Sequence, residues 1–239
     1  MWIQQQLLQP VPPHKLFHSY SPSNRTKIPS FAKLNSTHNT KIHNGIRNAK
    51  ITLEELPPNA LRMKREAEWI GGFSLGIDLG MSRTGIAVSR GFVVRPLMVL
   101  ELRGQKLEDR ILNIAEQEEA DEFIIGLPKS SDGNETTQSN IVRSVAGRLA
   151  VRAAERGWRV YLHDEHGTTA DAIDRMVNMG LSKSTKQKKL DAYAATMLLE
   201  RYFSTSGKKA ELVLPKNLEL QEKLRKGPPE DEDFFFDED

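Results

Sequence analysis

The sequence predicts an α/β fold in which helices flank a five-stranded mixed sheet. Three short apolar segments with brief connections follow one another between residues 73 and 102, which is typical of a strand meander. After residue 102, segments with helical spacing of apolar residues alternate with two further short apolar runs. The predicted order of elements is therefore strand, strand, strand, helix, strand, helix, strand, helix, helix (β-β-β-α-β-α-β-α-α).

The first three strands are predicted from apolar runs that turns separate. Residues 73–79 are apolar almost without a break, and residues 85–89 give a second strand after a glycine-containing turn. Residues 92–102 (FVVRPLMVLEL) give a third strand. Pro96 indicates that this strand lies at an edge or carries a bulge, because proline has no N–H to donate to a neighbouring strand.

Two helix–strand units follow the meander. Apolar residues recur at helical spacing over residues 107–115, and residues 121–127 then form a short buried strand. A second helix is predicted from about residue 138 to residue 156, and residues 159–163 form the fifth strand. The predicted inner face of that helix carries Ile141, Val145, Leu149 and Ala153. Helical crossovers allow the first, fourth and fifth strands to run parallel.

Two more helices are predicted to complete the domain. Thr168 and Asp171 fit a capping box, because the hydroxyl can accept a bond from the amide three residues on while the acid reaches back. A helix is therefore predicted from there to about residue 179. Residues 182–189 are polar and rich in lysine, which predicts a loop, and residues 190–203 form the last helix.

The two ends of the chain differ in composition from its middle. Residues 1–53 contain seven Lys or Arg, nine Ser or Thr and no Asp or Glu, which is typical of an organelle transit peptide. The excess of Ser and Thr favours the chloroplast stroma, with the mitochondrion as second choice and a merely flexible extension as the alternative. Residues 230–239 hold seven acids and no base, which predicts a disordered tail, although its three phenylalanines could form a docking motif.

The predicted organisation has three parts: a disordered transit peptide and linker at 1–60, a folded domain at 70–206 and a C-terminal extension at 207–239. The chain has no cysteine, so any metal must be held by carboxylate oxygens or imidazole rather than thiolates. No apolar run reaches the roughly 18 residues that a membrane helix needs, so no membrane association is expected. The net charge of +2 sums oppositely charged ends and therefore says little about partners.

Three acidic residues are predicted to meet at the carboxyl edge of the sheet. Asp78 ends the first strand, Glu165 follows the fifth, and Asp191 lies on the side of the last helix that should face inward. Asp78 and Glu165 each fit an ordinary turn when taken alone, whereas Asp191, on the inward side of a helix, needs a partner. Together they would repel one another unless a cation neutralised them, which a pair of magnesium ions sharing the carboxylates would do. Two such metals can activate water and stabilise the leaving oxygen of a phosphodiester.

Basic residues flank the same edge. Arg83 and Lys129 lie on the turns just beyond the strand ends, where they either contact phosphates or remain solvated. His166 directly follows Glu165 and either stabilises a leaving group or faces solvent. The pattern predicts metal-dependent chemistry on a nucleic-acid phosphate.

Four segments carry a resemblance to a known family: LGIDLGMSRTGIAV, IIGLPKSSDG, DEHGTTADA and KKLDAYAATMLLERYF. In this order and at these spacings they resemble the four successive motifs of the YqgF family, Holliday-junction-resolvase-like nucleases with an RNase H-like fold that are assigned to pre-16S rRNA processing. The resemblance covers about residues 73–204. It implies that Asp78, Glu165 and Asp191 are the catalytic and metal-binding residues, with Mg²⁺ or Mn²⁺ as cofactor.

The resemblance extends to other positions of the motifs, with two departures. The further matching residues are Arg83, Gly126, Pro128, Asp132, Gly133, Thr168 and Thr169. Nucleic-acid contacts are expected from Arg83, Lys129, His166, Thr168 and Thr169. His166 stands where the family usually has arginine, and Met81-Ser82 stands where a Thr-Lys pair is common. Both departures remove positive charge beside the acids and favour reduced or altered nuclease activity.

The resemblance implies an endonuclease that matures the 5′ end of a precursor 16S-type rRNA in the chloroplast. Its expected partners are structured RNA and the ribosomal small subunit, and the chain is a monomer or a homodimer. The alternatives are a resolvase that cuts branched DNA, which requires two active sites, and a non-catalytic rRNA-binding assembly factor. The GIDLG segment also resembles the phosphate-binding strand of sugar kinases and Hsp70-like ATPases, but those proteins need two such domains and this chain has room for one.

Overall fold

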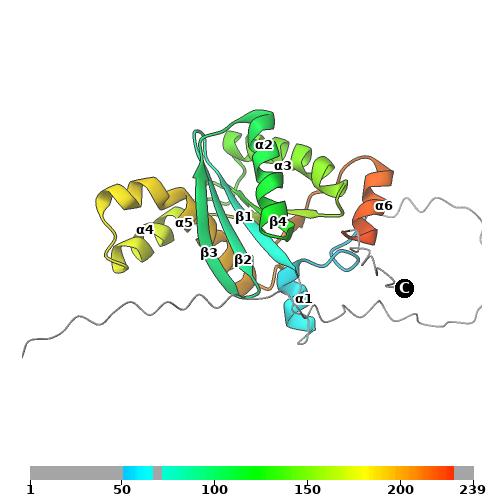
Figure 1. Ribbon diagram of the computed structural model, residues 1–239, viewed down its shortest axis with the longest axis horizontal. Helices are drawn as coiled ribbons and strands as arrows, with labels where there is room; N and C mark the ends of the chain where they lie inside the picture. The colour runs from blue at the N-terminus through cyan, green and yellow to red at the C-terminus, as the bar shows by residue number, and fades with distance from the viewer. Residues whose placement is uncertain (1–50, 67–71, 229–239) are drawn as a thin grey trace, which may run out of the picture. The chain divides into compact units, whose positions relative to one another are not determined.

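A six-stranded mixed sheet forms the centre of the computed structural model, which describes residues 51–66 and 72–228 (Figure 1). The strand order is β3-β2-β1-β4-β5-β6; β1 pairs antiparallel with β2 and parallel with β4, and β4 pairs parallel with β5. The strands are β1 (Phe73–Leu79), β2 (Thr84–Arg90), β3 (Val93–Leu100), β4 (Ala120–Leu127), β5 (Arg159–Asp164) and β6 (Glu211–Leu212).

Helices cover both faces of this sheet. The helices are α1 (Asn59–Arg65), α2 (Gly104–Gln117), α3 (Thr137–Ala154), α4 (Thr168–Asn178), α5 (Lys183–Ser204) and α6 (Leu218–Lys226). Residues of α2 and α3 share one buried cluster with the sheet, and residues of α5 share another with its opposite face. The predicted α/β architecture, a mixed sheet flanked by helices, is confirmed, with six strands rather than five because a two-residue strand pairs beside β5.

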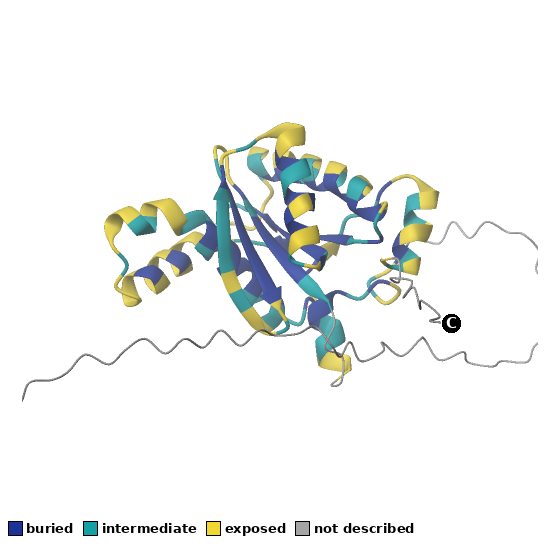
Figure 2. Cartoon of the chain, in the orientation of Figure 1, coloured by how far each residue is buried: buried dark blue, intermediate teal, exposed yellow. Residues whose placement is uncertain are grey.

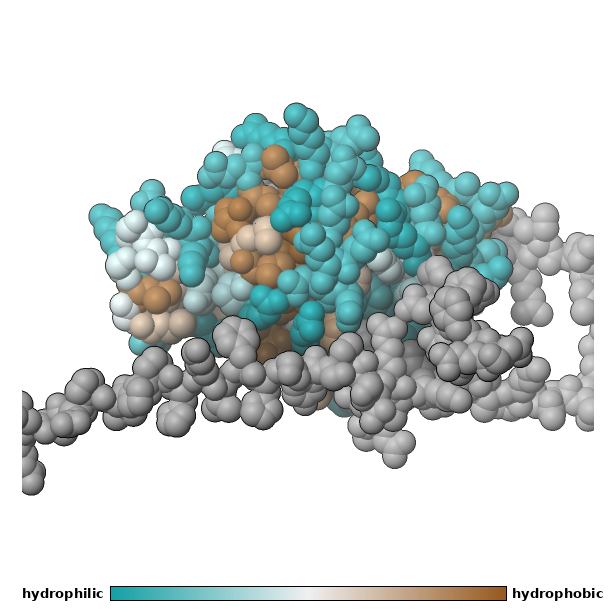
Figure 3. Space-filling model, in the orientation of Figure 1, coloured by the Kyte–Doolittle hydropathy of each residue, from teal (hydrophilic) through white to brown (hydrophobic). Residues whose placement is uncertain are grey.

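The central strands are buried on both sides, which explains why they read as apolar runs. Leu75 and Ile77 of β1 lie in the cluster with α2 and α3, whereas Ile124 of β4 lies in the cluster with α5. Figure 2 shows the buried sheet between partly exposed helices. Figure 3 shows hydrophilic side chains over most of this face, with an apolar patch near the middle of the view.

The edge position predicted from Pro96 is confirmed. β3 ends the sheet, and its pairing with β2 shifts register where Ile86 pairs with Met98 but Ala87 pairs with Pro96. The predicted inner face of α3 is wrong in part. Leu149 and Ala153 are buried as expected, but Ile141 is 45% exposed. The buried side of α3 includes Val142, Ala146 and Ala150 in its place.

Two local predictions are wrong. Residues 182–189 do not form a loop, because α5 begins at Lys183 and the side chain of Ser182 caps it by accepting a bond from the amide of Thr185 at 3.2 Å. The capping box at Thr168 is absent as well: the residue at the N-terminal cap of α4 is Gly167. The Thr168 hydroxyl instead donates to the carbonyl of Glu165 at 2.9 Å.

The predicted domain boundaries are corrected on both sides. Residues 51–60 are not a disordered linker, since Ile51 and Leu56 are buried in a cluster with Leu224 of α6. Residues after 206 contribute β6 and α6. Residues 1–50 and 229–239, which carry the predicted transit peptide and acidic tail, lie outside the described residues. Among the helices of the described part, none is both long and apolar enough to span a membrane.

Candidate active site

Asp78 lies next to the carboxyl end of the central strand β1. It pairs with Gly85 of β2, and β4 runs parallel on the other side of β1. Its carboxyl is largely enclosed, and burial raises its pKa to about 6, with a further contribution from the negative charge of Asp191. Asp78 therefore lies where its carboxyl can interact electrostatically with those of Asp191 and Glu165.

Glu165 follows β5 at the same edge of the sheet. The amide and hydroxyl of Thr168 both donate to the Glu165 carbonyl, at 3.0 and 2.9 Å, and hold the turn. Oε2 of Glu165 is buried and has no hydrogen-bond partner. Burial raises the pKa of this carboxyl to about 8, and the charges of Asp78 and Asp164 add to the shift.

The backbone of Gly126 makes room for that carboxylate. A Cβ atom at position 126 would lie 2.0 Å from Oε2 of Glu165, so the glutamate rests directly on β4. This contact explains why β4 needs glycine at position 126, near its carboxyl end.

Asp191 reaches the site because α5 lies unusually close to the sheet. A Cβ at Gly85 would lie 1.9 Å from the carbonyl oxygen of Asp191, and one at Gly76 would lie 2.6 Å from Cγ of Leu199. Two glycines on adjacent strands thus let the helix backbone settle against β1 and β2. Oδ2 of Asp191 forms an ion pair with Nε of Arg83 at 2.9 Å.

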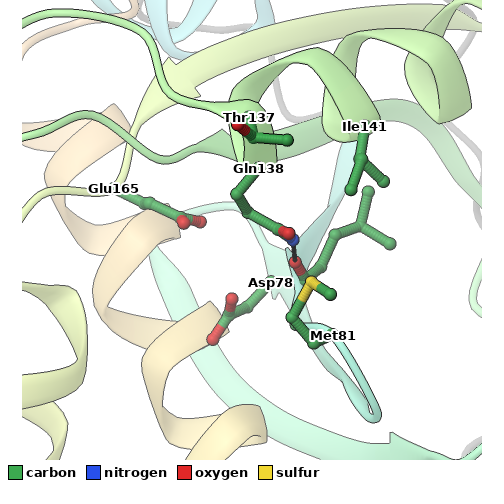
Figure 4. A pocket seen from close by; sticks show the side chains of 8 residues that line it. Asp78, Met81, Thr137, Gln138, Ile141 and Glu165 are labelled. Atoms are coloured by element: carbon green, nitrogen blue, oxygen red, sulfur yellow. Dashed lines mark hydrogen bonds between the residues drawn. The ribbon is translucent and has the colours of Figure 1, made fainter.

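Asp78 and Glu165 border one cavity of about 440 Å³ (Figure 4). The side chains of Asp78, Glu165 and Gln138 point toward its interior. Its lining consists of Asp78, Leu79, Gly80, Met81, Thr137, Gln138, Ile141 and Glu165. Within residues 51–66 and 72–228, no three His, Asp or Glu side chains are already gathered as a metal cage. The negative charge of Asp191 raises the pKa of Asp78, and that of Asp78 raises the pKa of Glu165, so Asp78 interacts electrostatically with both other members of the predicted triad.

The residues of this site fit a hard divalent cation. All three side chains offer carboxylate oxygens, which Mg²⁺ and Mn²⁺ prefer. Oε2 of Glu165 is buried without a hydrogen-bond donor, and the pKa values of Asp78 and Glu165 are raised. A positive charge in the site would therefore stabilise their ionised forms. Asp78, Glu165 and Asp191 are the residues that would hold such an ion.

The predicted phosphate-binding cations face the acids. Arg83 turns inward, with Nη1 donating to the carbonyl of Gln187 at 3.3 Å in addition to its ion pair with Asp191. Nζ of Lys129 lies 4.0 Å from Oδ2 of Asp164, beside Glu165. Both therefore lie at the rim of the site, as the sequence predicts, although each already has an acidic partner.

His166, Thr168 and Thr169 occupy different surroundings. The His166 side chain is exposed; its backbone amide donates to Oδ1 of Asp164 at 2.9 Å, and its carbonyl accepts a bond from Arg201. Thr168 is buried and holds the turn at Glu165, so its role is structural. Thr169 is exposed in the first turn of α4 and available to a ligand.

Two other motif positions shape the loop between β4 and α3. The carboxylate of Asp132 accepts bonds from the Ser130 hydroxyl and from Nδ2 of Asn134, at 2.6 Å for the latter, and these bonds lower its pKa. Gly133 has φ of +80°, which favours glycine. Asp132 is thus a turn residue rather than part of the acidic site.

Gln138 is a site residue that no sequence pattern indicates. Its Nε2 donates to the carbonyl of Leu79 at 3.0 Å, and its Oε1 is buried without a hydrogen-bond partner. The two residues are 59 positions apart in the chain, so only the fold reveals the contact.

Residues 72–205 match the family model described as RuvX, Holliday junction resolvase. A protein of Nitratidesulfovibrio vulgaris named "Putative pre-16S rRNA nuclease" is 32% identical over 134 residues, which cover 54% of this chain and 92% of that protein. A protein of Rickettsia typhi with the same name is 32% identical, covering 53% of this chain and 81% of its own length. The corresponding protein of Shewanella oneidensis is 29% identical, covering 54% and 92%.

Among solved structures, one described as "T. thermophilus RuvC in complex with Holliday junction substrate" aligns with a TM-score of 0.40 and 17% identity. The alignment covers 59% of this chain and 99% of that chain.

Proposed function

The chain belongs to the RuvX family of Holliday junction resolvases, and from this premise we propose that it is a metal-dependent endonuclease that cuts precursor small-subunit rRNA. The observation that carries the proposal is the pairing of Asp78 with both Glu165 and Asp191 beside a cavity, with Oε2 of Glu165 buried and unpartnered. The names of the curated relatives support rRNA as the substrate class.

When bound, Mg²⁺ or Mn²⁺ supplies the positive charge and Lewis acidity that phosphodiester hydrolysis requires. The chain provides the oxygen ligands, and the pKa values of their carboxyl groups determine which of them are protonated. Because the pKa of Glu165 is about 8, its carboxyl holds a proton at neutral pH in the metal-free protein, and binding of a cation there would release that proton. Asp78, whose pKa is about 6, is then the first of the two to ionise as pH rises.

Arg83 has two roles in this proposal. Without a cation, its guanidinium neutralises Asp191 at 2.9 Å. If Asp191 held a cation, Arg83 would be released from this ion pair, and its planar guanidinium would be suited to a non-bridging phosphate oxygen. Lys129, whose Nζ lies 4.0 Å from Oδ2 of Asp164, and the exposed Thr169 in the first turn of α4 would add contacts to the phosphate backbone of the nucleic acid.

The test compares two substrates under one set of conditions. The full chain with Mg²⁺ is expected to cut precursor small-subunit rRNA, and Asp78→Asn, Glu165→Gln and Asp191→Asn are each expected to abolish cutting while retaining the far-UV spectrum of the wild type. Asp174→Asn is the matched control, because Asp174 is an exposed acid on α4. Cutting at the wild-type rate by all three site variants would overturn the proposal.

The family description favours branched DNA as the second candidate substrate. A four-way DNA junction cut faster than precursor rRNA would support it, provided that the chain is a dimer in solution, because resolution needs two cuts. Tight rRNA binding without any product in Mg²⁺ would instead support the assembly-factor alternative, in which the exposed His166 stands where the related family usually has arginine.

We also propose that the acid-free N-terminal region directs the chain to the chloroplast stroma, with the mitochondrion as second choice. The burial of Ile51 and Leu56 supports removal of that region before residue 51, since a later cut would expose the cluster around Leu224. A fluorescent protein fused to residues 1–50 is expected to enter chloroplasts. A uniform cytosolic signal would contradict the proposal.

A further inference from the structure

The cavity beside the acids has an apolar wall that phosphodiester hydrolysis does not require. Met81, after β1, and Ile141, on α3, line the same cavity as Asp78 and Glu165. Figure 4 shows Met81 and Ile141 on the side of the cavity away from Glu165. Their exposed fractions are 70% for Met81 and 45% for Ile141. Two large apolar side chains thus stand open to solvent next to the proposed reaction centre.

These side chains are not needed for the core. The inner side of α3 is formed by Val142, Ala146 and Leu149, each of which is fully buried, and Ile141 lies outside that face. Exposed apolar surface that borders a cavity is typical of a site that a ligand covers. A bare phosphate would gain nothing from this wall, because its oxygens seek donors and cations.

Gln138 adds a polar group with a fixed direction. The N-terminus of α3 is fixed by a capping box between Thr136 and Ser139, two residues before and one after this position. Nε2 of Gln138 donates to the Leu79 carbonyl at 3.0 Å, which determines which way the amide points. Gln138 lines the cavity, and its Oε1 is a buried acceptor without a donor; such groups are satisfied in the functional state by a partner.

We propose that Met81, Gln138 and Ile141 form a binding site for one unstacked nucleobase next to the scissile phosphate, here called the base site. The two apolar side chains contact the faces of the base, and Oε1 of Gln138 accepts an N–H from its edge. A cavity of about 440 Å³ is in the size range of small-molecule sites. The inference deepens the proposed nuclease function and rests on it for the position of the phosphate.

The base site defines a class of substrate. In an intact duplex, neighbouring bases cover both faces of each base, and the opposite strand occupies its edge, so the base cannot reach such a wall without being extruded. The preferred substrate is therefore a strand in which the nucleotide beside the cut is unpaired, as in a loop, a bulge or a single-stranded extension.

The main experiment removes first the nucleobase of the substrate and then the apolar side chains of Met81 and Ile141. The cut site is mapped with the full chain in Mg²⁺, and a second substrate carries an abasic nucleotide beside it. The wild type is expected to bind and cut the abasic substrate about tenfold less well. The double variant Met81→Ala/Ile141→Ala is expected to lose about the same factor on the intact substrate and to show no further loss on the abasic one.

Val151→Ala is the matched control, because Val151 also lies on α3 and is 40% exposed but does not line the cavity. It is expected to discriminate against the abasic substrate as the wild type does. If the double variant also retains full discrimination, the base site is refuted, while the nuclease proposal stands as long as Asp78→Asn is inactive.

A measurement that does not depend on cutting separates the two proposals. A short single-stranded RNA containing 4-thiouridine, irradiated with the full chain, is expected to cross-link to the peptides that contain Met81 or Ile141. Cross-links confined to other peptides would overturn the base site even if the nuclease is active, and the expected cross-links would support it even if no cutting occurs.

The hydrogen bond to Gln138 has its own test. Replacing an adenosine beside the cut by purine riboside, which lacks the amino group, is expected to cost the wild type about threefold to tenfold in affinity and to cost Gln138→Met nothing. If Gln138→Met instead changes only the Mg²⁺ concentration needed for cutting, Oε1 serves the cation and this part of the proposal fails.

Discussion

The carboxylate of Glu165 rests on the backbone of Gly126, where a Cβ atom would lie only 2.0 Å from Oε2. Gly126 pairs with His163 of β5, so Glu165, two residues farther along the chain, turns back over β4 toward Asp78. The position of the glutamate in the site therefore depends on the absence of a side chain on the neighbouring strand.

Gly126→Ala is expected to displace Glu165 and lower the single-turnover cleavage rate by about 100-fold, since displacements near 1 Å can have effects of that size. Stability should change little, because the atoms nearest the new methyl belong to the Glu165 side chain rather than to backbone. Cleavage kinetics and urea unfolding measure the two effects.

Gly147→Ala is the control for this substitution. Gly147 lies inside α3 and a Cβ there meets no atom within 4 Å, so the variant should gain up to about 1 kcal/mol in stability and keep its activity. Wild-type cleavage by Gly126→Ala would show that Glu165 does not need its present position.

Asn59 connects the segment before the sheet to buried charges at the edge opposite the acids. Its Oδ1 accepts a bond from Arg159 at 2.8 Å, and its Nδ2 donates to Oδ1 of Asp121 at 3.0 Å. Its backbone amide donates to Oε2 of the fully buried Glu122 at 2.8 Å. Asn59→Ala is expected to lower the free energy of unfolding by about 2–3 kcal/mol, because its side-chain bonds to the buried Arg159 and to Asp121 are lost while the backbone bond to Glu122 remains.

Urea unfolding measures this change, with Asn140→Ala as control because Asn140 is an exposed residue of α3. An effect no larger than that of the control would contradict the role assigned to Asn59. Removal of residues 1–50 should leave stability unchanged, whereas removal of residues 1–66 should produce an aggregating or unfolded chain.

The pKa of Glu165 predicts how stability depends on pH in the absence of metal. Its value of about 8 exceeds the ordinary 4.5, so between these values the folded chain binds a proton that the unfolded chain has released. The contribution is complete below pH 4.5 and is lost as pH rises through 8. The free energy of unfolding should therefore fall with pH, by at most about 1.4 kcal/mol per unit for this group.

The clearest window runs from pH 6.5 to about 8. Below 6.5 the lowered pKa of His163 acts in the opposite direction, and Asp78, with a pKa of about 6, is ionised through most of the window. Urea unfolding of metal-free protein should show the fall for the wild type and for Asp174→Asn but a flatter dependence for Glu165→Gln. Equal slopes in all three would exclude Glu165 as the source.

Much of the fold follows from the sequence because its signals are local. Strands buried on both faces are apolar runs, and Pro96 marks the bulged edge strand correctly. The spacing of the large apolar residues wrongly predicted that Ile141 lies on the inner face of α3, because alanines form part of that face. The first two turns of α5 are polar and mostly solvent-exposed, so no apolar pattern marks them.

The site is predictable only in part, because some of its contacts join residues that are far apart in the chain. Asp78, Glu165 and Asp191 follow from strand ends and family motifs, and in the fold the charge of Asp191 acts on Asp78 and that of Asp78 acts on Glu165. Gln138 and Asn59 act through contacts across 59 and 63 residues of chain, for which the sequence has no local signal. The ion pair of Arg83 with Asp191 could not be predicted from the sequence either, because it depends on the close approach of α5 to β2.

The central claim is that Asp78 and the acids around it hold a divalent cation for phosphodiester hydrolysis. The most direct test measures the single-turnover cleavage rate of a precursor rRNA in which sulfur replaces a non-bridging oxygen of the scissile phosphate. The account predicts that the full chain cuts the unmodified RNA with Mg²⁺ and cuts the sulfur-substituted RNA poorly with Mg²⁺ but well with Mn²⁺, while Asp78→Asn cuts neither. Equal cutting of both RNAs in Mg²⁺, or cutting that persists in EDTA, would contradict it.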